Sequence, residues 1–259
     1  MPPRYRLYAG WRGEADKVSA RWSSAILDLG ELGPDGRVLD IGCGPGRIAA
    51  RLTRQLERGS YEGFDIDPRS IRWCRRKISS RHPNFHFQLA DIRNAEYNPA
   101  GSQEARAYTF PYRDDEFDLA LAASVFTHML PGEIERYVSE AARVLKPDGR
   151  LLASFFLLNE DTQLRLMYSG RRILGAKEDD GGVHYRSQDA TTPERMIAVF
   201  EEGIRKIYAG AGLTIETIGY GKWCGRRDGF LGFGQDLVVA RKGRVRSEAP
   251  ASAELTPAA

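Results

Sequence analysis

The stretch "RVLDIGCGPGRIAARL" at residues 37–52 places three glycines and a proline between an apolar run and a helix-like segment. The glycines are Gly42, Gly44 and Gly46. Glycine adopts backbone conformations that other residues avoid, and it lets another group approach the main chain closely. The stretch therefore predicts a tight turn between a strand and a helix, with main chain exposed just beyond the strand.

Strand-like and helix-like segments alternate from this turn onward. Apolar runs predict strands at 37–42, 61–67, 85–91, 117–124 and 150–158, and periodic runs predict helices at 47–57, 68–80 and 131–149. A helix at 193–208 and two final strands at 213–221 and 235–242 follow. Strands that alternate with helices are typical of βαβ units in a parallel sheet. The expected fold class is α/β, doubly wound, with helices on both faces of a mostly parallel sheet.

Two long segments, 94–113 and 159–192, interrupt this alternation. The second is too polar for a core and too long for a passive connection, so it predicts a small helical or loop-built cap over a site. We expect an N-terminal helical segment at 1–33 over that site and a main domain at 34–243 that carries the cap. The end of the chain, 244–259, is rich in Ala, Ser, Pro and Glu and is predicted to be disordered.

The composition is that of an ordinary globular protein. The net charge is +3 and charged residues make up 28% of the chain, so charge gives no strong sign of a nucleic-acid partner. The three cysteines, Cys43, Cys74 and Cys224, are far apart, which predicts neither a disulfide framework nor a metal site. The chain starts without an apolar signal segment, and its apolar runs are shorter than a membrane span. We expect a cytoplasmic protein without membrane contact.

Two carboxylates limit what the glycine turn can hold. Asp65 ends the second predicted strand, 23 residues after Gly42, which suits a carboxylate that accepts hydrogen bonds from both hydroxyls of a ribose. Asp40 precedes the first glycine by two positions and brings a negative charge to the turn. A dinucleotide fold uses G-x-G-x-x-G, whereas the glycines here are one residue closer and include Pro45. A pyrophosphate would be repelled, and a sulfonium or ammonium would be attracted.

At this point the chain resembles the class I S-adenosylmethionine-dependent methyltransferases. The matching pieces, in family order over about residues 37–158, are "VLDIGCGPGRIA", "GFDIDPRSI", "FQLADIRNA", "YRDDEFDLALAASVFTHM" and "EAARVLKPDGRLLASFF". The resemblance implies a seven-stranded sheet whose last strand is antiparallel. It also implies S-adenosyl-L-methionine as cofactor and S-adenosyl-L-homocysteine as product.

The resemblance assigns roles to individual residues. Asp40, Gly42 and Gly44 would line the methionine part of the cofactor, and Gly46 would shape the turn. Asp65 would bind the ribose, and the main chain near Ala123 would receive the methionine ammonium. The adenine would be held by the remaining three residues, which pack on the ring, accept from its amino group and donate a backbone N–H to it, namely Ile66, Asp91 and Ile92.

Methyl transfer from a sulfonium chiefly needs alignment of donor and acceptor, and a general base matters only for a protonated nucleophile. The base candidates are His128, after the fourth strand, and His184, in the predicted cap. We expect a small-molecule acceptor, methylated at oxygen rather than nitrogen. The alternatives are a protein or nucleic-acid methyltransferase, or a non-catalytic module that binds S-adenosylmethionine. Against a DNA amino-methyltransferase, "AASVF" stands where such enzymes keep (D/N)PP(Y/F).

Overall fold

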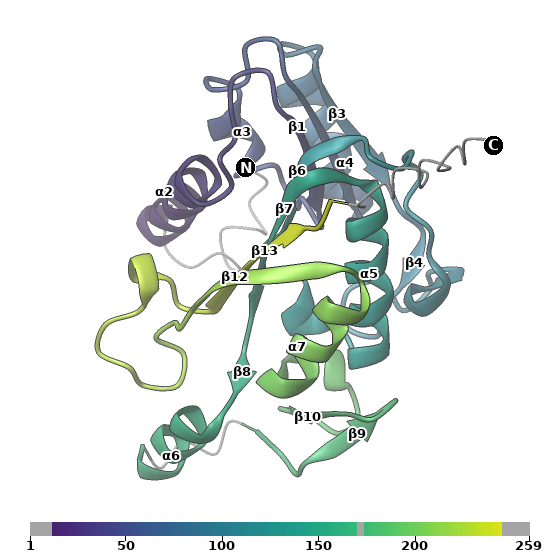
Figure 1. The fold of residues 1–259 in the computed structure, drawn as a ribbon. Coiled ribbons are helices and arrows are strands. Elements are labelled where there is room, and N and C mark those ends of the chain that lie inside the picture. Colours follow the sequence, from purple (N-terminus) through teal and green to yellow (C-terminus); the bar gives the residue numbers. More distant parts are fainter. Residues whose placement is uncertain (1–11, 170–173, 245–259) are drawn as a thin grey trace, which may run out of the picture.

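A single large sheet organises the molecule (Figure 1). The computed structural model describes residues 12–169 and 174–244, so the first 11 residues of the predicted N-terminal segment and nearly all of the predicted tail lie outside the described residues. Within the described part the main sheet has seven strands in the order β12-β13-β7-β6-β1-β2-β3. The strands are β1 (Arg37–Ile41), β2 (Ser60–Asp65), β3 (Phe85–Leu89), β6 (Phe117–Ala122), β7 (Leu145–Phe155), β12 (Leu213–Gly219) and β13 (Asp236–Lys242).

The direction of the strands confirms the predicted topology. β1 pairs in parallel with β2 and β6, and β2–β3 and β6–β7 are also parallel. β13 alone runs antiparallel to its two neighbours, β7 and β12. The carboxyl ends of the parallel strands therefore meet at one edge, the edge at which ligands bind in sheets of this type.

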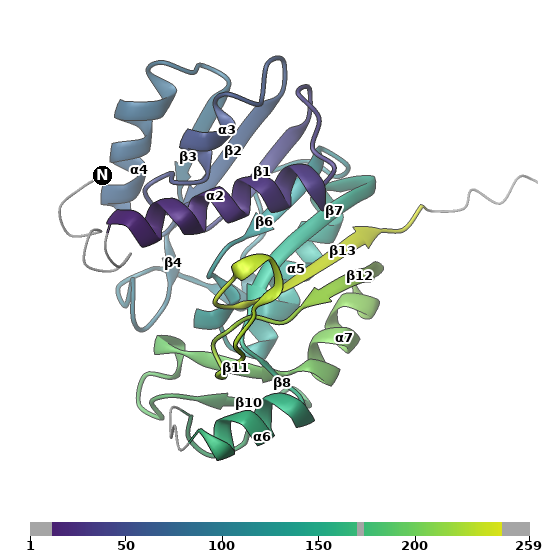
Figure 2. The same ribbon diagram turned by 90° about the vertical axis from the view of Figure 1, so that its left-hand side faces the viewer.

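Helices cover both faces of the sheet. One face carries α2 (Arg12–Asp28), α3 (Ala49–Leu52) and α4 (Pro68–Cys74), which continues into a π-helical turn, η1 (Arg75–Ser79). The other face carries α5 (Pro131–Val144) and α7 (Glu201–Gly210), as Figures 1 and 2 show. The α4 helix begins where the Asp67 carboxylate accepts from two backbone N–H groups and Pro68 takes the first turn.

Two helices are shorter than predicted. The segment 47–57 forms only α3, although its apolar residues Ile48, Leu52 and Leu56 are buried as expected. The α5 helix ends at Val144, because Leu145 already has extended backbone angles and starts β7. Pro147 and Gly149, which are residues that typically end a helix, therefore lie inside the strand.

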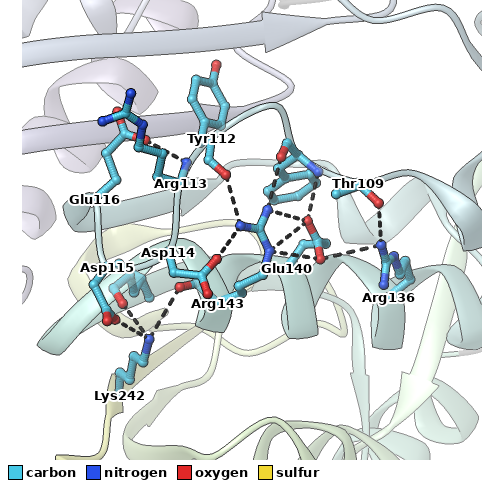
Figure 3. A network of polar contacts seen from close by, with 12 residues as sticks. Thr109, Tyr112, Arg113, Asp114, Asp115, Glu116, Arg136, Glu140, Arg143 and Lys242 are labelled. Atoms are coloured by element: carbon cyan, nitrogen blue, oxygen red, sulfur yellow. Dashed lines mark hydrogen bonds and ion pairs between the residues drawn. The ribbon is translucent and has the colours of Figure 1, made fainter.

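The segment between β3 and β6 is described without an α-helix, and side chains of α5 hold it in place. It contains β4 (Ile92–Arg93), β5 (Gln103–Glu104) and a short 3-10 turn, η2 (Ala105–Ala107). The buried Glu140 carboxylate accepts from the Phe110 N–H at 2.8 Å, and the Arg143 guanidinium donates to the carbonyls of Phe110 and Tyr112. Figure 3 shows Glu140, Arg143 and Tyr112 in this network. These contacts fix the loop that leads into β6.

The segment predicted as a helical or loop-built cap instead contributes to a second sheet, with one α-helix among the described residues. The elements of the cap are β8 (Leu157–Leu158), α6 (Glu160–Tyr168), β9 (Glu178–Asp180), β10 (Val183–Ser187), a 3-10 turn η4 (Pro193–Arg195) and β11 (Ile197–Phe200). Four of these are strands, in the order β8-β11-β10-β9. The predicted helix at 193–208 is therefore wrong in its first half, since residues 197–200 form a strand that is buried against the main core and only α7 is helical.

Side-chain contacts tie the cap to the main domain. The Asp180 carboxylate of β9 binds the Arg106 guanidinium at 2.6 Å and accepts from the Gly132 N–H at 2.9 Å, at the start of α5. A carboxylate is favourable at a helix N-terminus because of the unpaired N–H groups there. The cap sheet also presents Tyr185, Ile197 and Val199 to the same core as α5 and α7.

Candidate functional site

The carboxyl ends of β1, β2 and β3 are joined by backbone hydrogen bonds. The N–H groups of Gly42 and Cys43 both donate to the Phe64 carbonyl, at 2.9 and 3.0 Å. The Ala90 N–H donates to the Asp65 carbonyl at 3.0 Å. The glycine turn after β1, the carboxylate after β2 and the turn after β3 therefore form one continuous rim.

The three glycines of the turn share a backbone conformation but differ in their surroundings. All have positive φ angles, +70° at Gly42, +52° at Gly44 and +71° at Gly46, which explains why glycine stands at each. A Cβ at Gly46 would lie 2.6 Å from Ile78 and 2.9 Å from Cys74, so this glycine lets the turn pack on α4 and η1. A Cβ at Gly44 would meet nothing within 4 Å. The open space at Gly44 is where a ligand can approach the backbone.

The Asp65 carboxylate lies beside this open space. Its Oδ2 accepts from the Gly44 N–H at 2.7 Å, and its Oδ1 accepts from the Asp67 N–H at 2.8 Å. Burial raises the pKa of the carboxyl, and the backbone N–H groups oppose that rise. A carboxylate oxygen has two lone pairs, so each oxygen can accept a further hydrogen bond from a hydroxyl. This geometry fits the expected ribose contact.

Asp40 is almost entirely buried beneath the turn, with 1% of its surface exposed. Its Oδ2 accepts from the hydroxyl of Tyr61 on β2, whereas its Oδ1 is buried without a hydrogen-bond partner among the described residues. The register of the strands explains the contact, because Asp40 pairs with Gly63, and Tyr61 stands two residues earlier on the same face. A Cβ at Gly63 would lie 3.0 Å from the Tyr61 ring, so glycine makes room for it.

The burial of Asp40 disfavours the charged form of its carboxyl group. Burial raises the pKa of the carboxyl to about 7, the hydroxyl of Tyr61 lowers it, and the charge of Asp65 raises it. A buried carboxylate normally has hydrogen bonds to both oxygens. Asp40 is thus a carboxylate that lacks one partner, at the spot where the sequence predicts a positively charged part of a ligand.

The predicted adenine residues lie around the turn after β3. Asp91 is exposed, and its carboxylate accepts from the Ser102 hydroxyl at 2.5 Å. Ile92 is buried, and Ile66 is half-buried against the same core. Ile66 directly follows β2, whereas Asp91 and Ile92 follow β3, and the contact of the three residues with adenine stays a prediction.

The main chain after β6 is strained at the same edge. Leu121 pairs with Asp40 across β1 and β6, which brings Ala123 to the rim two residues later. Ser124 has a positive φ of 58°, which is uncommon for a residue with a side chain. Its N–H donates to the Ser154 hydroxyl at 2.8 Å. Strain of this kind is typical of functional edges, and the predicted ammonium contact near Ala123 lies here.

His128 follows β6 in a short 3-10 turn, η3 (Phe126–His128), and contacts the cap. Its Nδ1 lies 2.9 Å from the carbonyl oxygen of Glu194, and its Nε2 lies 3.5 Å from the Tyr97 hydroxyl. Because a carbonyl only accepts, Nδ1 carries the proton and Nε2 keeps a lone pair. Burial lowers the pKa of the imidazole, so the ring is neutral near pH 7. His128 is thus held as a base would be held.

His184 lies elsewhere on the cap. It is exposed on β10, on the opposite face of the strand from the buried Tyr185, and its Nδ1 lies 3.1 Å from the Asp179 carboxylate. Its ring also contacts Phe200 edge-on, at 6.1 Å between centroids. The structure therefore places His128 at the contact between η3 and η4, whereas His184 lies on the exposed face of β10.

A groove of about 590 Å³ is a second candidate for a ligand site. It lies against β2 and β3 and the loop before β6, and it is lined by residues that include Glu62, Gln88, Tyr112, Arg113 and Arg143. Arg143 is already paired with the carboxylates of Glu140 and Asp114 (Figure 3). The lining includes none of the residues that the sequence predicts for the site, so the rim of the parallel strands is the better candidate.

Residues 38–149 match the family model described as a methyltransferase domain, and this match spans β1 to the start of β7 with the glycine turn and Asp65. This segment is therefore a methyltransferase domain, in agreement with the resemblance to the class I S-adenosylmethionine-dependent methyltransferases. Within the described residues of this methyltransferase, no helix is both long and apolar enough to cross a bilayer.

The curated relatives are methyltransferases of small molecules. This methyltransferase is 33% identical over 116 residues to phthiotriol/phenolphthiotriol dimycocerosates methyltransferase 1 of Mycobacterium ulcerans, covering 45% of this chain and 36% of that protein. It is 32% identical over 116 residues to a fatty-acid O-methyltransferase of Mycolicibacterium smegmatis, covering 45% and 35%. The matched segment thus spans little more than a third of the length of these relatives.

A solved structure matches more of the chain. The 1,6-didemethyltoxoflavin-N1-methyltransferase of Burkholderia thailandensis, solved with 1,6-didemethyltoxoflavin and S-adenosylhomocysteine, aligns with a TM-score of 0.55 at 20% identity. The alignment covers 93% of this chain and 85% of that one. At this identity the likeness shows the fold, including the part beyond residue 149.

The residues of the rim fit the cofactor of the family. The space at Gly44 admits a ligand beside the main chain, Asp65 offers acceptors to a ribose, and the unpartnered Oδ1 of Asp40 suits a cation. The sequence alone missed two contributors, the Tyr61 hydroxyl and the Glu194 carbonyl. The first could be found from strand register, whereas the second joins residues that are 66 positions apart.

Proposed function

We propose that this methyltransferase transfers a methyl group to a small-molecule acceptor, and to an oxygen in preference to a nitrogen. The observation that carries the proposal is the imidazole of His128, neutral and held by the Glu194 carbonyl with Nε2 as its acceptor atom. S-adenosylmethionine, when bound, supplies the electrophilic methyl group. The chain itself must align the acceptor, exclude water and take up the proton of a hydroxyl nucleophile.

The position of His128 supports the role of base. Its turn follows β6 at the rim that carries the glycine turn, and the carbonyl of η4 holds the ring from the cap side. Tyr97 packs edge-on against the ring at 5.1 Å and offers its hydroxyl to Nε2. A hydroxyl acceptor would replace that hydroxyl at Nε2 and donate its proton there. His184, exposed beside Asp179, is the weaker candidate for the same role.

The cap supports a compact acceptor over a macromolecule. Its strands pack into the main core and its turn η4 contacts η3, so the cap lies beside the turn that carries His128. The curated relatives named above act on lipids and fatty acids by their names. Three buried free thiols, Cys43, Cys74 and Cys224, suit a reducing compartment, and we place the reaction in the cytoplasm.

A matched acceptor series tests the proposed chemistry. The series is a 4-alkylphenol, a 4-alkylaniline and a 4-alkylbenzoate of one chain length, each offered with methyl-labelled S-adenosylmethionine. We expect labelled product from the oxygen acceptors. Labelling of the aniline in preference to the phenol would contradict O-methylation. Labelling of a peptide or RNA mixture but of none of the three small molecules would contradict a small-molecule acceptor, and binding without transfer to any acceptor would favour a non-catalytic module.

The role of His128 has its own test. In His128→Asn the amide N–H can still donate to the Glu194 carbonyl, but the basic Nε2 is gone. We expect kcat with the phenol to fall about 100-fold, the usual worth of a general base, while the Kd for S-adenosylhomocysteine stays within about twofold. His184→Asn is the matched control and should leave kcat unchanged. The opposite result would assign the base to His184.

A further inference from the structure

Tyr61 and Asp40 form a buried pair that the reaction chemistry above does not use. The Tyr61 side chain is wholly buried, and it stacks on Phe85 with 5.1 Å between ring centroids and a 16° angle between planes. The Phe87 ring also packs against it, with 5.6 Å between ring centroids. The hydroxyl therefore has one fixed position, and it donates to Asp40 Oδ2.

The other oxygen of Asp40 is an unpaired acceptor. Asp40 Oδ1 is buried and has no hydrogen-bond partner in the described part of the chain. An unmet acceptor on a buried carboxylate costs free energy, so the pair is complete only when a donor arrives. The cofactor of the family carries one cationic N–H donor in its amino-acid part, the α-ammonium. A buried carboxylate and an ammonium form a charge-assisted hydrogen bond, which is among the stronger kinds.

We propose that Tyr61 is a positioning residue for the cofactor: its hydroxyl holds one oxygen of Asp40 so that the other is presented to the α-ammonium. Tyr61 does not touch the ligand in this account, and it acts only through Asp40. The proposal rests on the family's cofactor and not on the identity of the acceptor or on His128. It therefore can fail while the proposed function stands.

The neighbours of Asp40 make the contact sensitive to pH. The groups that influence its carboxyl are Tyr61 and Asp65, and the thiols of Cys43 and Cys74 lie close by. Since burial raises the pKa of Asp40 to about 7, lowering the pH protonates the oxygen that an ammonium needs. Loss of the Tyr61 hydroxyl removes a contact that lowers this pKa, so it should move the titration to higher pH.

Two ligands distinguish a positioning role of Tyr61 from a purely structural one. S-adenosylhomocysteine carries the α-ammonium, whereas 5′-methylthioadenosine has the same adenine, ribose and sulfur but lacks the amino acid. Calorimetry with both ligands reads out binding without any acceptor. In Tyr61→Phe, which keeps the aromatic stack, we expect the Kd for S-adenosylhomocysteine to rise about tenfold, and the Kd for methylthioadenosine to stay within about twofold.

A control variant and a cycle complete the test. Tyr208 is also wholly buried, but its hydroxyl has no partner and lies on the α7 face, so Tyr208→Phe should change neither Kd. In an Asp40→Asn background, Tyr61→Phe should have almost no further effect on S-adenosylhomocysteine, because the acceptor that it positions has changed. Between pH 5.5 and 7.0 the wild-type affinity for S-adenosylhomocysteine should rise about tenfold, and that for methylthioadenosine should rise less.

Three results would overturn the proposal. Equal weakening of both ligands in Tyr61→Phe would show a purely structural role. An unchanged Kd for S-adenosylhomocysteine would show that the hydroxyl is not needed, for example because a buried water meets Asp40. Binding of neither ligand to the wild-type chain would remove the cofactor assignment together with this proposal.

Discussion

The carboxyl edge of the main sheet buries two carboxylates, Asp40 at the end of β1 and Asp236 at the start of β13. Both are inaccessible, at 1% and 0% exposure. Asp236 accepts from the backbone N–H groups of Leu157 and Gly221 and from the indole N–H of Trp223, each at 2.7 Å. Asp40 accepts from one hydroxyl, and its second oxygen has no partner.

The difference separates a carboxylate that stabilises the fold from one with an unpaired acceptor, which we propose binds the cofactor. The three donors to Asp236 come from the start of the cap and from the loop between β12 and β13, so the carboxylate joins parts of the chain that would otherwise separate. Three hydrogen bonds offset part of the cost of burying the Asp236 charge, although burial still raises the pKa of its carboxyl. Asp40 joins only two neighbouring strands, and the single hydrogen bond from Tyr61 offsets less of that cost.

The largest effect should come from removing the satisfied carboxylate. Asp236→Ala leaves three buried donors without an acceptor, so we expect the free energy of unfolding to fall by about 4 kcal/mol. Urea unfolding should show a lower midpoint with an unchanged slope. A loss below about 1 kcal/mol would mean that water replaces the carboxylate and that the two sites differ less than their contacts indicate.

The glycine turn offers a second comparison, between two glycines that differ in the space available for a side chain. Gly46→Ala should cost about 2 kcal/mol of stability, from its positive φ and the contact with Ile78 and Cys74. Gly44→Ala has the positive φ but open space around it, so it should cost about 1 kcal/mol. The order should reverse for S-adenosylhomocysteine, which we expect Gly44→Ala to weaken more. Thermal unfolding and calorimetry on both variants measure the two orders, and equal effects on binding would contradict the assignment of the open space.

The smallest effect concerns the pH dependence of stability. The pKa of Asp40 is raised by burial to about 7 in the folded chain, against an ordinary value of 3.8. The folded state therefore holds a proton that the unfolded state has lost, and stability falls as the pH rises through 7. Between pH 6 and pH 7 this contribution amounts to about 1 kcal/mol.

Asp40→Asn should remove that slope and be no less stable than the wild type above pH 7, in contrast to Asp236→Ala. The measurement is the wild-type free energy of unfolding at pH 6 and pH 7 minus that of Asp40→Asn. A difference that grows with pH would show that the Asp40 carboxylate has a partner in the free protein.

Sequence patterns predict the main sheet well because each of its strands has its own local signal. The runs around Val38, Phe64, Phe87 and Leu119 are short, apolar and followed by turn or helix residues, and each forms the expected strand. The glycine turn is equally local, because the positive φ angles require glycine at those positions.

The cap and the pairing of the site residues need information from distant parts of the chain. Residues 193–208 begin with a proline and show a helical period, yet Ile197–Phe200 forms a strand because β8 and β10 lie on either side of it. The Tyr61–Asp40 contact depends on the register between β1 and β2. The His128–Glu194 contact depends on where the cap comes to rest, which no local pattern of residues encodes.

The way in which the second sheet is attached has a consequence for how this enzyme can diversify. β8 follows β7 after one residue, and β11 runs directly into α7, so these two cap strands are continuous with the main domain. The β9–β10 hairpin, by contrast, is attached through the Asp180 contacts, the pairing of β10 with β11 and the buried Tyr185 side chain. Replacement of that hairpin in a relative would change this side of the cap, while the glycine turn and Asp65 stay unchanged.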